Sequence, residues 1–394
     1  MTQPNHLNQD YDIIIVGAGM VGASMAAALA DTRLDILLID KQIPVFDDTQ
    51  EQPEIRVSSI SKGSVDWLNE QQIWQHLNPE RLRYYQQLSV NEKAKSECHF
   101  YAKDLMLDNL GCFVENAHLQ AAALKQNPFP VIEAQIQSCK FIKDHWQLTF
   151  STGEQVKTQL IIAADGAHSK IRQLCHFPSH GWQYPQACYS ALVKLEQTPN
   201  MEQTWQTFDQ AGAIAFLPLQ KEYANLIVYR TQAQAQTLAK QPLNEQQKQL
   251  KTWFKGKLAE FELLESASFP LQKMSVFDTQ KQGVILVGDA AHTIHPLAGQ
   301  GVNLGIRDIA KLVKLIKTEQ NNLNRLQSTK TFIGYSLQRN LDVQAMSGMM
   351  DLVFFAFKNK NPVLGWLRNQ AMSGVEYIKP VKQLVLKQAL GKID

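Results

Sequence analysis

Short apolar runs that end in glycine-rich or acidic turns recur along this chain. Asp12-Ile13-Ile14-Ile15-Val16 is a continuous, mostly β-branched run that predicts a buried strand, and Gly17-Ala18-Gly19-Met20-Val21-Gly22 then opens an alanine-rich helix that runs to about Ala30. Similar runs at Ile36-Leu37-Leu38-Ile39, Leu160-Ile161-Ile162-Ala163-Ala164 and Val284-Ile285-Leu286-Val287 predict further strands. Strands that alternate with helices in this way predict an α/β fold.

The first of these turns has the pattern of a dinucleotide-binding loop. Gly17 allows the tight bend, Gly19 allows a pyrophosphate to approach the backbone, and Gly22 lets the helix pack on the strand. Asp40 ends the next strand, where its carboxylate can accept a hydrogen bond from an adenosine ribose hydroxyl. A GxGxxG string alone is weak because ordinary turns also contain it, but here the strand, the helix and the distal acid all agree.

A second polar cluster follows the strand at residues 284–287. Asp289 lies at the tip of that strand, and residues 299–303 (Gly-Gln-Gly-Val-Asn) start another helix. The carboxylate can accept hydrogen bonds from the hydroxyls of a sugar-like chain, and a helix N-terminus stabilises negative charge. A reduced flavin has a part for each of these groups, because its ribityl chain carries hydroxyls and its N1/C2 carbonyl edge carries negative charge. We therefore predict that the nucleotide is a flavin.

A third turn, Asp165-Gly166-Ala167-His168-Ser169-Lys170-Ile171-Arg172, also joins a strand to a helix. Considered alone, it has an ordinary interpretation, in which Asp165 caps the helix and Ser169 and Arg172 lie on the helix surface. Because two other strand-to-helix turns also carry acids, a role in the nucleotide site is equally open.

Composition narrows the possible classes of protein. With 394 residues, 44% of them hydrophobic, the chain can form one large domain or two closely joined ones. A net charge of +2 gives no sign of nucleic-acid binding. The five cysteines are scattered without a CxxC pair, which argues against a disulfide framework and suits a reducing, cytoplasmic setting. The N-terminal apolar run lacks a basic leader, and no stretch approaches the roughly 20 apolar residues of a spanning helix.

The three turns together, GxGxxG, DGxxSxxR and GD followed by PxxGQGxN, resemble the single-component flavoprotein aromatic hydroxylases over nearly the whole chain. The string from His295 to Asp308 is similar to the signature of the ubiquinone-biosynthesis hydroxylases. Within that family, four segments are most similar to the branch that hydroxylates demethoxyubiquinol, namely residues 52–61, 181–184, 204–208 and 346–357.

The resemblance implies a fold of the para-hydroxybenzoate hydroxylase type. Residues 1–75, 100–180 and 275–330 would form a discontinuous Rossmann-like FAD-binding domain, residues 76–99 and 181–274 an inserted, mostly antiparallel substrate-binding sheet, and residues 331–394 a C-terminal helical region. Within the inserted region, residues 187–195, 204–208 and 225–229 have the composition of antiparallel strands. Residues 232–257 have roughly helical spacing of apolar positions, which favours one solvated helix on that sheet over an interaction motif.

The resemblance also implies the reaction. The enzyme would use FAD, O₂ and NAD(P)H or another electron donor, and would hydroxylate 2-polyprenyl-3-methyl-6-methoxy-1,4-benzoquinol by way of a flavin C4a-hydroperoxide. A sister ring hydroxylase that acts at another carbon and a non-catalytic flavoprotein subunit of a quinone-synthesis complex remain as alternatives. A nicotinamide dehydrogenase would explain the first glycine turn but not Asp289 and residues 299–303.

Carried over residue by residue, the resemblance gives a set of site residues. Pro296 would shape the ring pocket, Asp165 and Gly166 would support the cofactor, and Arg56 would meet the FAD phosphates or the isoalloxazine edge, unless it forms only a surface salt bridge. The other expected cofactor-binding residues are Gly17, Gly19, Val21, Gly22, Asp40, Asp289, Gly299, Gln300, Gly301, Val302 and Asn303.

Other polar and aromatic residues point to the site less strongly. Trp182, Tyr184 and Gln186 are candidates for the ring pocket, although aromatic residues at the start of a sheet are more often core. His292 and His295 lack a third ligand at a suitable spacing, so we expect structural roles and no metal site. No residue is assigned as a catalytic acid or base, because a quinol ring already carries strongly donating hydroxyls.

The segment after about Leu341 differs from the rest of the chain. Methionines and aromatic residues crowd positions 346–357, two shorter apolar runs follow, and lysine and arginine are interleaved with all three. Basic apolar helices suit an anionic membrane surface, here the inner face of the membrane. Helices that simply cover the FAD domain or form a subunit interface would show the same pattern, and the prenylated substrate alone favours membrane contact.

Overall fold

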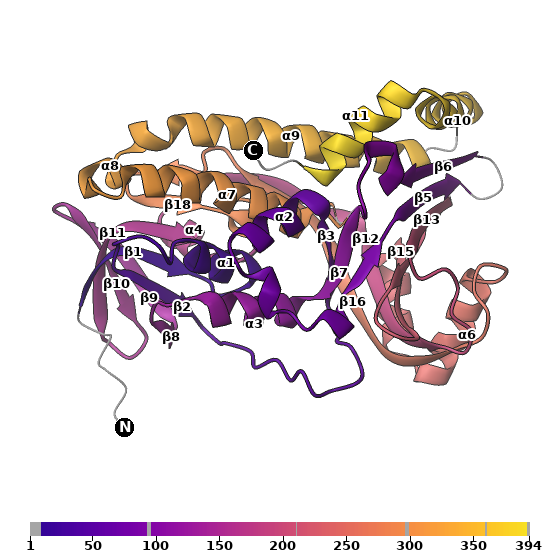
Figure 1. The fold of residues 1–394 in the computed structure, drawn as a ribbon, viewed down its shortest axis with the longest axis horizontal. Helices are drawn as coiled ribbons and strands as arrows, with labels where there is room; N and C mark the ends of the chain where they lie inside the picture. Colours follow the sequence, from indigo (N-terminus) through magenta and orange to yellow (C-terminus); the bar gives the residue numbers. More distant parts are fainter. Residues whose placement is uncertain (1–8, 93–95, 210, 296–298, 359–360, 392–394) are drawn as a thin grey trace.

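The computed structural model describes residues 9–92, 96–209, 211–295, 299–358 and 361–391. Figure 1 shows a first sheet at one end of the molecule and a second sheet at the other, with α7 and α9 running along one side. This arrangement confirms the α/β class with an added antiparallel sheet.

The first sheet has the strand order β17-β18-β11-β1-β2-β8, with β10 and β9 added beside β11. β18, β11, β1, β2 and β8 run parallel. Its strands are β1 (Asp10–Val16), β2 (Ile36–Asp40), β8 (Val131–Glu133), β9 (Ile136–Ile142), β10 (His145–Phe150), β11 (Gln155–Ala163), β17 (Gln280–Lys281) and β18 (Val284–Leu286).

The continuous apolar run of β1 is explained by cover on both faces of this sheet. Ile13 and Ile15 pack with α1 (Met20–Ala28), α3 (Asn116–Gln126) and α7 (Gly301–Glu319), whereas Ile14 and Val16 pack on the opposite side with β9, β10 and α4 (Lys170–Leu174). The carboxyl ends of β1, β11 and β18 therefore meet at one edge of the sheet, followed by the three predicted turns.

The second sheet has the order β19-β16-β12-β15-β14-β13-β5-β6 and is antiparallel except between β13 and β5. The three predicted strand segments lie in β12, β13 and β15, which confirms them. The strands are β5 (Gln87–Glu92), β6 (Ser96–Tyr101), β12 (Ser179–Leu195), β13 (Gln203–Asp209), β14 (Gly212–Pro218), β15 (Tyr223–Thr231), β16 (Phe261–Val276) and β19 (His292–Thr293).

The region from residue 232 to 257 forms two helices, so the prediction of a single helix was wrong. α5 (Gln232–Ala239) and α6 (Leu243–Trp253) are separated at Pro242, which precedes α6 as its N-cap. Proline has no backbone N–H and cannot continue a helix from its preceding turn, so the chain must restart there. Both helices pack on one face of the second sheet.

A three-stranded sheet of β3 (Val57–Ser61), β7 (Gly111–Glu115) and β4 (Arg83–Tyr85) lies between the two large sheets, and α2 (Lys62–Glu70) follows β3. The C-terminal helices are α8 (Leu323–Gln327), α9 (Thr329–Lys358), α10 (Pro362–Tyr377) and α11 (Lys379–Leu390). In the described parts of the chain, no helix combines the length and apolar character that crossing a bilayer requires.

Candidate functional site

The glycine turn after β1 is held rigidly by its surroundings. Gly17 has a φ of +103°, and a Cβ there would lie 2.3 Å from the carbonyl oxygen of Ala164. The next residue is held through both of its peptide groups, because the Ala18 amide donates to Asp40 Oδ2 at 2.7 Å and Gln120 Nε2 donates to the Ala18 carbonyl at 2.7 Å. The turn is thus preorganised before any ligand binds.

Gly19 differs from Gly17 in having open space. No heavy atom lies within 4 Å of a Cβ placed on Gly19, whereas one placed on Gly22 would lie 1.9 Å from the Gly17 carbonyl oxygen. A phosphate could therefore approach the backbone at Gly19, and Gly22 is needed for the packing of α1. Asp40 stays a predicted ribose ligand, and its bond to Ala18 is a second role that the sequence did not reveal.

Asp289 lies in the short 3₁₀ turn Gly288–Ala290 after β18. Burial among protein atoms raises the pKa of its carboxyl, yet the residue remains exposed to solvent. The carboxylate thus has protein atoms around it and remains accessible to a ligand from solvent. A Cβ on Gly301 would lie 3.8 Å from Asp289 Oδ1, so the start of α7 lies beside this carboxylate.

The glycine turn and the turn after β18 meet at Val21. Its side chain lies 3.5 Å from a Cβ placed on Gly288 and 2.7 Å from one placed on Gly305. Close packing of α1 against α7 thus brings the two predicted loops together, although they are separated by more than 250 residues in the sequence.

The start of α7 is tied to the edge of the three-stranded sheet. Asn303 Oδ1 accepts from the Ser61 amide at 2.8 Å, and its Nδ2 donates to the Ser59 carbonyl at 2.8 Å. Gly299 adopts a φ of +61°, Gln300 is buried with Oε1 unpaired among the described residues, and Val302 is half-buried. Pro296, the predicted pocket residue, lies outside the described residues.

One carboxylate oxygen of Asp165 accepts hydrogen bonds from the start of α4, and the other has no hydrogen-bond partner among the described residues. Its Oδ2 accepts from the amides of Lys170 at 2.6 Å and Ile171 at 3.2 Å, while Oδ1 is buried without a partner in the described structure. Burial raises the pKa of this carboxyl. The neighbouring Gly166 has a φ of +79°, and a Cβ added to it would meet no atom within 4 Å, so this glycine leaves room beside Asp165.

The ordinary interpretation of the third turn was wrong in one respect, because Ser169 and Arg172 are buried instead of lying on the surface. Ser169 Oγ accepts from the Arg172 amide at 3.0 Å. The guanidinium of Arg172 donates to the carbonyls of Ala167 at 2.6 Å and Ala290 at 2.9 Å. Arg172 thus ties the turn after β11 to the turn after β18, a role that sequence reasoning missed.

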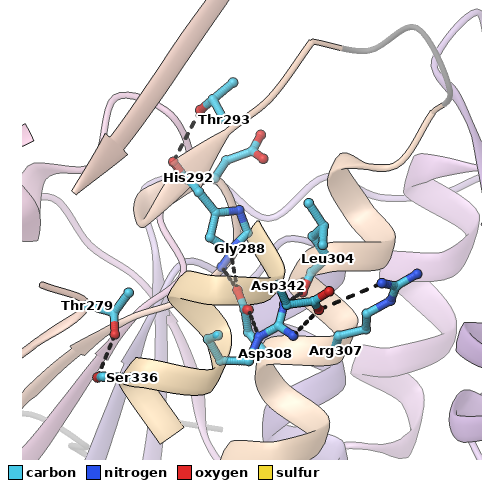
Figure 2. Close-up of polar contacts among 11 residues, drawn as sticks. Thr279, Gly288, His292, Thr293, Leu304, Arg307, Asp308, Ser336 and Asp342 are labelled. Carbon is cyan, nitrogen blue, oxygen red and sulfur yellow. Dashed lines mark hydrogen bonds and ion pairs between the residues drawn. The ribbon is translucent and has the colours of Figure 1, made fainter. Parts of the chain in front are cut away.

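Below the turn after β18 lies a buried ion cluster, shown in Figure 2, that the sequence did not predict. Asp308 Oδ2 accepts from the Gly288 amide at 2.8 Å and from His292 Nε2 at 2.7 Å, and Oδ1 pairs with Arg339 Nε at 2.6 Å. Burial alone would raise the pKa of Asp308, but the electrostatic interactions with His292 and Arg339 and these hydrogen bonds lower it to about 2. The cluster anchors the backbone that presents Asp289.

Arg56 does not show a contact with the glycine turn among the described interactions. The residue is exposed, and its guanidinium carbon lies 5.5 Å from the centre of the Phe269 ring on β16. Its predicted role toward FAD stays a prediction. Within the described residues, no group of three or more His, Cys, Asp or Glu side chains is arranged to hold a metal ion.

The three weaker candidates on β12 have different surroundings. Trp182 is 45% exposed, and Lys273 Nζ lies 4.6 Å from its ring centre. Tyr184 is buried, its hydroxyl donates to Asp351 Oδ1, and its ring meets His295 edge-on at 4.6 Å. Gln186 is buried and Nε2 donates to the Ala211 carbonyl at 3.2 Å. Tyr184 is thus the candidate whose ring contacts the loop that leads to residue 296.

A buried apolar cluster, here called the apolar wall, joins the second sheet to α9 and to residue 294. Tyr184 and Ile294 belong to it, and so do Met346 and Met350 of α9. Its other buried members are Phe208, Ala213, Tyr229, Leu271 and Leu304. Methionine side chains are flexible and fill irregular gaps between such packed elements.

Three features of the structure fit a flavin dinucleotide. The backbone at Gly19 is open, the oxygens Asp165 Oδ1 and Gln300 Oε1 are buried without described partners, and Asp289 is accessible from solvent. Buried polar atoms without partners are costly, so a polar ligand that satisfies them is expected.

Comparison with known proteins agrees with this geometry. Residues 143–324 match the family model described as an FAD binding domain, and residues 15–45 match an NAD(P)-binding Rossmann-like domain. The chain is 34% identical over 389 residues to 3-demethoxyubiquinol 3-hydroxylase of Escherichia coli (strain K12), covering 98% of this chain and 99% of the relative. It is 26% identical over 437 residues to the mitochondrial ubiquinone biosynthesis monooxygenase COQ6 of Homo sapiens, covering 95% and 92%.

Solved structures show the same fold at low sequence identity. The p-nitrophenol 4-monooxygenase PnpA of Pseudomonas putida matches with a TM-score of 0.78 at 15% identity, covering 98% of this chain and 99% of that one. A variant of HpxO from Klebsiella pneumoniae complexed with FAD matches with a TM-score of 0.76 at 16% identity, covering 98% and 100%.

Proposed function

Because this chain belongs to the family of FAD-dependent hydroxylases of ubiquinone biosynthesis, we propose that it hydroxylates the ring of demethoxyubiquinol, a polyprenylated benzoquinol. The chain is an FAD-dependent monooxygenase. The observation that carries the proposed substrate is the full-length similarity to 3-demethoxyubiquinol 3-hydroxylase.

The apolar wall supports a prenylated substrate. It lies beside the loop that continues from β19 toward α7, so a ring held against the start of α7 would have apolar surface next to it. Burial of apolar surface stabilises binding by about 25 cal/mol per Å². A prenyl chain along this wall would therefore contribute affinity without any additional polar recognition.

Each loop of the site has a proposed part in the reaction. FAD, when bound, supplies the chemistry that activates O₂ for transfer to the ring. We expect the Gly17–Gly22 turn to hold the pyrophosphate, Asp289 to accept hydrogen bonds from the ribityl hydroxyls, and the amides at residues 299–303 to stabilise negative charge on the ring edge. The wall formed by α9 and the second sheet would orient the substrate and exclude water.

The proposed domain boundaries follow the positions of these elements. Residues 1–75, 100–180 and 275–330 would form the FAD-binding domain, residues 76–99 and 181–274 the substrate domain, and residues 331–394 a helical region that closes over both. In support, β5 and β6 pair with the second sheet rather than the first. The substrate pocket would then lie where the two large domains meet.

The corner between α10 and α11 supports contact with a membrane surface. Tyr377 is 84% exposed, Ile378 52% and Leu384 68%, and the exposed Lys379 and Lys387 lie among them. Apolar side chains surrounded by lysines suit insertion between the headgroups of anionic lipids. A prenylated quinol resides in the bilayer, so such contact would bring the enzyme to its substrate.

The test of the proposed function is turnover by the purified holoenzyme. Demethoxyubiquinol with a short prenyl chain, a nicotinamide or other reductant and ¹⁸O₂ should give a product with one added ¹⁸O atom, as measured by mass spectrometry. Hydroxylation of an earlier ring precursor instead would assign the chain to a sister step. Bound FAD without any hydroxylated product would indicate a non-catalytic subunit.

A further inference from the structure

Two cysteines that are far apart in the sequence meet in the core beside the first sheet. The Sγ atoms of Cys139 and Cys175 lie 3.8 Å apart, and all five cysteines of the chain are free thiols. Cys139 is an inward-facing residue of β9, and Cys175 is the C-cap residue of α4. We call these two residues the cysteine pair. No motif in the sequence reveals it, because the contact depends on the packing of α4 against β9.

The cysteine pair is buried but keeps some contact with solvent. Each of its two residues is 8% exposed, whereas Cys112 is fully buried and Cys98 is 4% exposed. The surrounding side chains are mostly apolar and belong to the core cluster that covers one face of the first sheet. A small neutral oxidant can therefore reach the two sulfur atoms without unfolding the protein.

A lysine on a third element places positive charge beside Cys175. Lys281 of β17 donates to the carbonyl oxygen of Cys175 at 3.0 Å and to that of His176. The hydrogen bond shared with Cys139 lowers the pKa of the Cys175 thiol, burial opposes this effect, and the charge of Lys281 adds to it. The same hydrogen bond and burial raise the pKa of Cys139. Cys175 is therefore the sulfur that ionises first and attacks an oxidant.

The other three cysteines have a different environment. Burial raises the pKa of Cys98 and of Cys188 to about 12, and it raises the pKa of Cys112 as well. The thiolate is the form of cysteine that reacts with oxidants. We therefore expect these three residues to remain thiols under mild oxidation.

We propose that the cysteine pair is a reversible oxidation site for hydrogen peroxide. The Cys175 thiolate attacks one peroxide oxygen, the O–O bond breaks, and a sulfenic acid and hydroxide form. The Cys139 sulfur then attacks the Cys175 sulfur, so that an S–S bond forms, the S–O bond breaks, and the oxygen leaves as water with the Cys139 proton. The two thiols together lose two electrons and two protons, and one peroxide is reduced to two waters.

The oxidant is a by-product of flavin chemistry with O₂. A flavin monooxygenase that reduces O₂ without transferring an oxygen atom to its substrate releases hydrogen peroxide. The cysteine pair lies at the end of α4, whose Arg172 donates to the Ala290 carbonyl next to Asp289. Peroxide released at the flavin would thus form on the same molecule as the pair. The proposal requires this class of activity but does not depend on which ring is hydroxylated.

The nearby Cys139 gives Cys175 a protection that an isolated thiol lacks. A sulfenic acid without a neighbouring thiol is oxidised further to a sulfinic acid, which thiol reductants do not reverse. A second sulfur 3.8 Å away makes disulfide formation intramolecular and therefore fast. The pair would convert an irreversible lesion into a disulfide that a thiol reductant can open.

Mass spectrometry of the folded, FAD-loaded protein tests the pair. After treatment with a small excess of hydrogen peroxide, we expect the wild type to lose about 2 Da, and peptide mapping should find Cys139 linked to Cys175. Dithiothreitol should restore the original mass. The FAD content before and after treatment verifies that the protein stays folded, and added peroxide makes the result independent of turnover.

Two variants separate the roles of the sulfur atoms. Cys139→Ser should accumulate sulfinic acid on Cys175, a gain of about 32 Da that dithiothreitol does not reverse. The control Cys188→Ser removes a half-buried thiol outside the pair and should form the same disulfide as the wild type. Melting temperatures would verify that both variants fold. A wild type that keeps five free thiols, a disulfide that includes Cys188, or an unmodified Cys175 in Cys139→Ser would overturn the proposal.

Discussion

At the residue scale, Gly17 and Gly19 of the first turn exclude a side chain for different reasons: protein atoms crowd Gly17, whereas the space at Gly19 is open to a ligand. Gly17→Ala would force a side chain into the carbonyl of Ala164 from a left-handed backbone, so we expect a loss of about 1–3 kcal/mol of stability together with loss of FAD. Gly19→Ala meets no protein atom and keeps an ordinary φ of −67°, so the folded chain should be as stable as wild type. Its FAD dissociation constant should nevertheless rise by more than about tenfold, because the new methyl group occupies the space of the pyrophosphate.

Thermal unfolding without FAD and a flavin titration together separate these two effects. If Gly19→Ala bound FAD as tightly as wild type, the open space at this glycine would not be the phosphate site. If Gly17→Ala were as stable as wild type, the turn would be able to relax away from Ala164.

His295 should make the stability of the protein depend on pH. The residue is 1% exposed, and burial lowers the pKa of its imidazole to about 4 from an ordinary value of 6.5. Between these two values the unfolded chain binds a proton that the folded chain does not, so this stabilising contribution is present above pH 6.5 and is lost as the pH falls toward 4. The full effect is about 3 kcal/mol.

A His295→Gln variant isolates this contribution. Urea unfolding of both proteins between pH 7 and pH 4 should show the wild type losing more stability than the variant, by up to about 3 kcal/mol. Parallel losses across this range would mean that His295 already carries a proton in the folded protein or is open to water.

The sequence predicted the role of a residue where that role depends on its immediate neighbours in the chain. Gly17 needs its backbone conformation because of the turn it forms, and that need is visible in the residues next to it. Arg172, Gln120 and Asp308 could not be assigned, because each acts on a carbonyl, amide or side chain of a segment far away in the sequence. The sequence held two signals of these contacts. Arg172 is a charged residue in a turn beside a buried strand, and Asp308 lies on the apolar face of the helix that forms α7.

At the element scale, the pair of Asp308 and Arg339 joins α7 to α9. Both side chains are 2% exposed, so removing one partner breaks a buried ion pair, and the other keeps only its second contact, Arg339 with Asp342 or Asp308 with His292. We expect Asp308→Leu or Arg339→Met to cost about 3–5 kcal/mol of stability each. The double variant should be more stable than the sum of the two by at least about 1 kcal/mol, as measured in a double-mutant cycle by urea unfolding. Additive losses would show that the two helices are held together by other contacts.

Elements were predicted well where the apolar pattern is continuous and less well where proline interrupts it. The parallel strands were visible because both faces of the first sheet are covered, which makes residues 13–16 of β1 and 36–39 of β2 continuous apolar runs. The single helix expected at residues 232–257 is two helices, since Pro242 separates them. The apolar crowding of α9 was seen in the sequence, but only the structure shows that one face of the helix is buried and the other is exposed.

At the scale of the whole molecule, the corner of α10 and α11 should determine membrane contact. Replacing Tyr377 and Leu384 together with serine removes exposed apolar surface without touching the first sheet, so we expect weaker co-sedimentation with anionic vesicles and unchanged FAD content. Binding to vesicles of neutral lipid should be weaker than to anionic vesicles for the wild type, because Lys379 and Lys387 contribute electrostatic attraction. Equal binding of the wild type and the double variant would contradict this contact.

We propose that loops far apart in the chain hold one FAD, with Asp289 at the ribityl chain. The most direct test of this proposal is the flavin content and substrate-dependent O₂ consumption of Asp289→Ala, compared with Asp278→Ala, which changes an exposed aspartate between β16 and β17. We predict that the wild type and Asp278→Ala carry about one FAD per chain and turn over, and that Asp289→Ala loses both the flavin and the activity. An Asp289→Ala protein with normal flavin content and a normal rate would contradict the account.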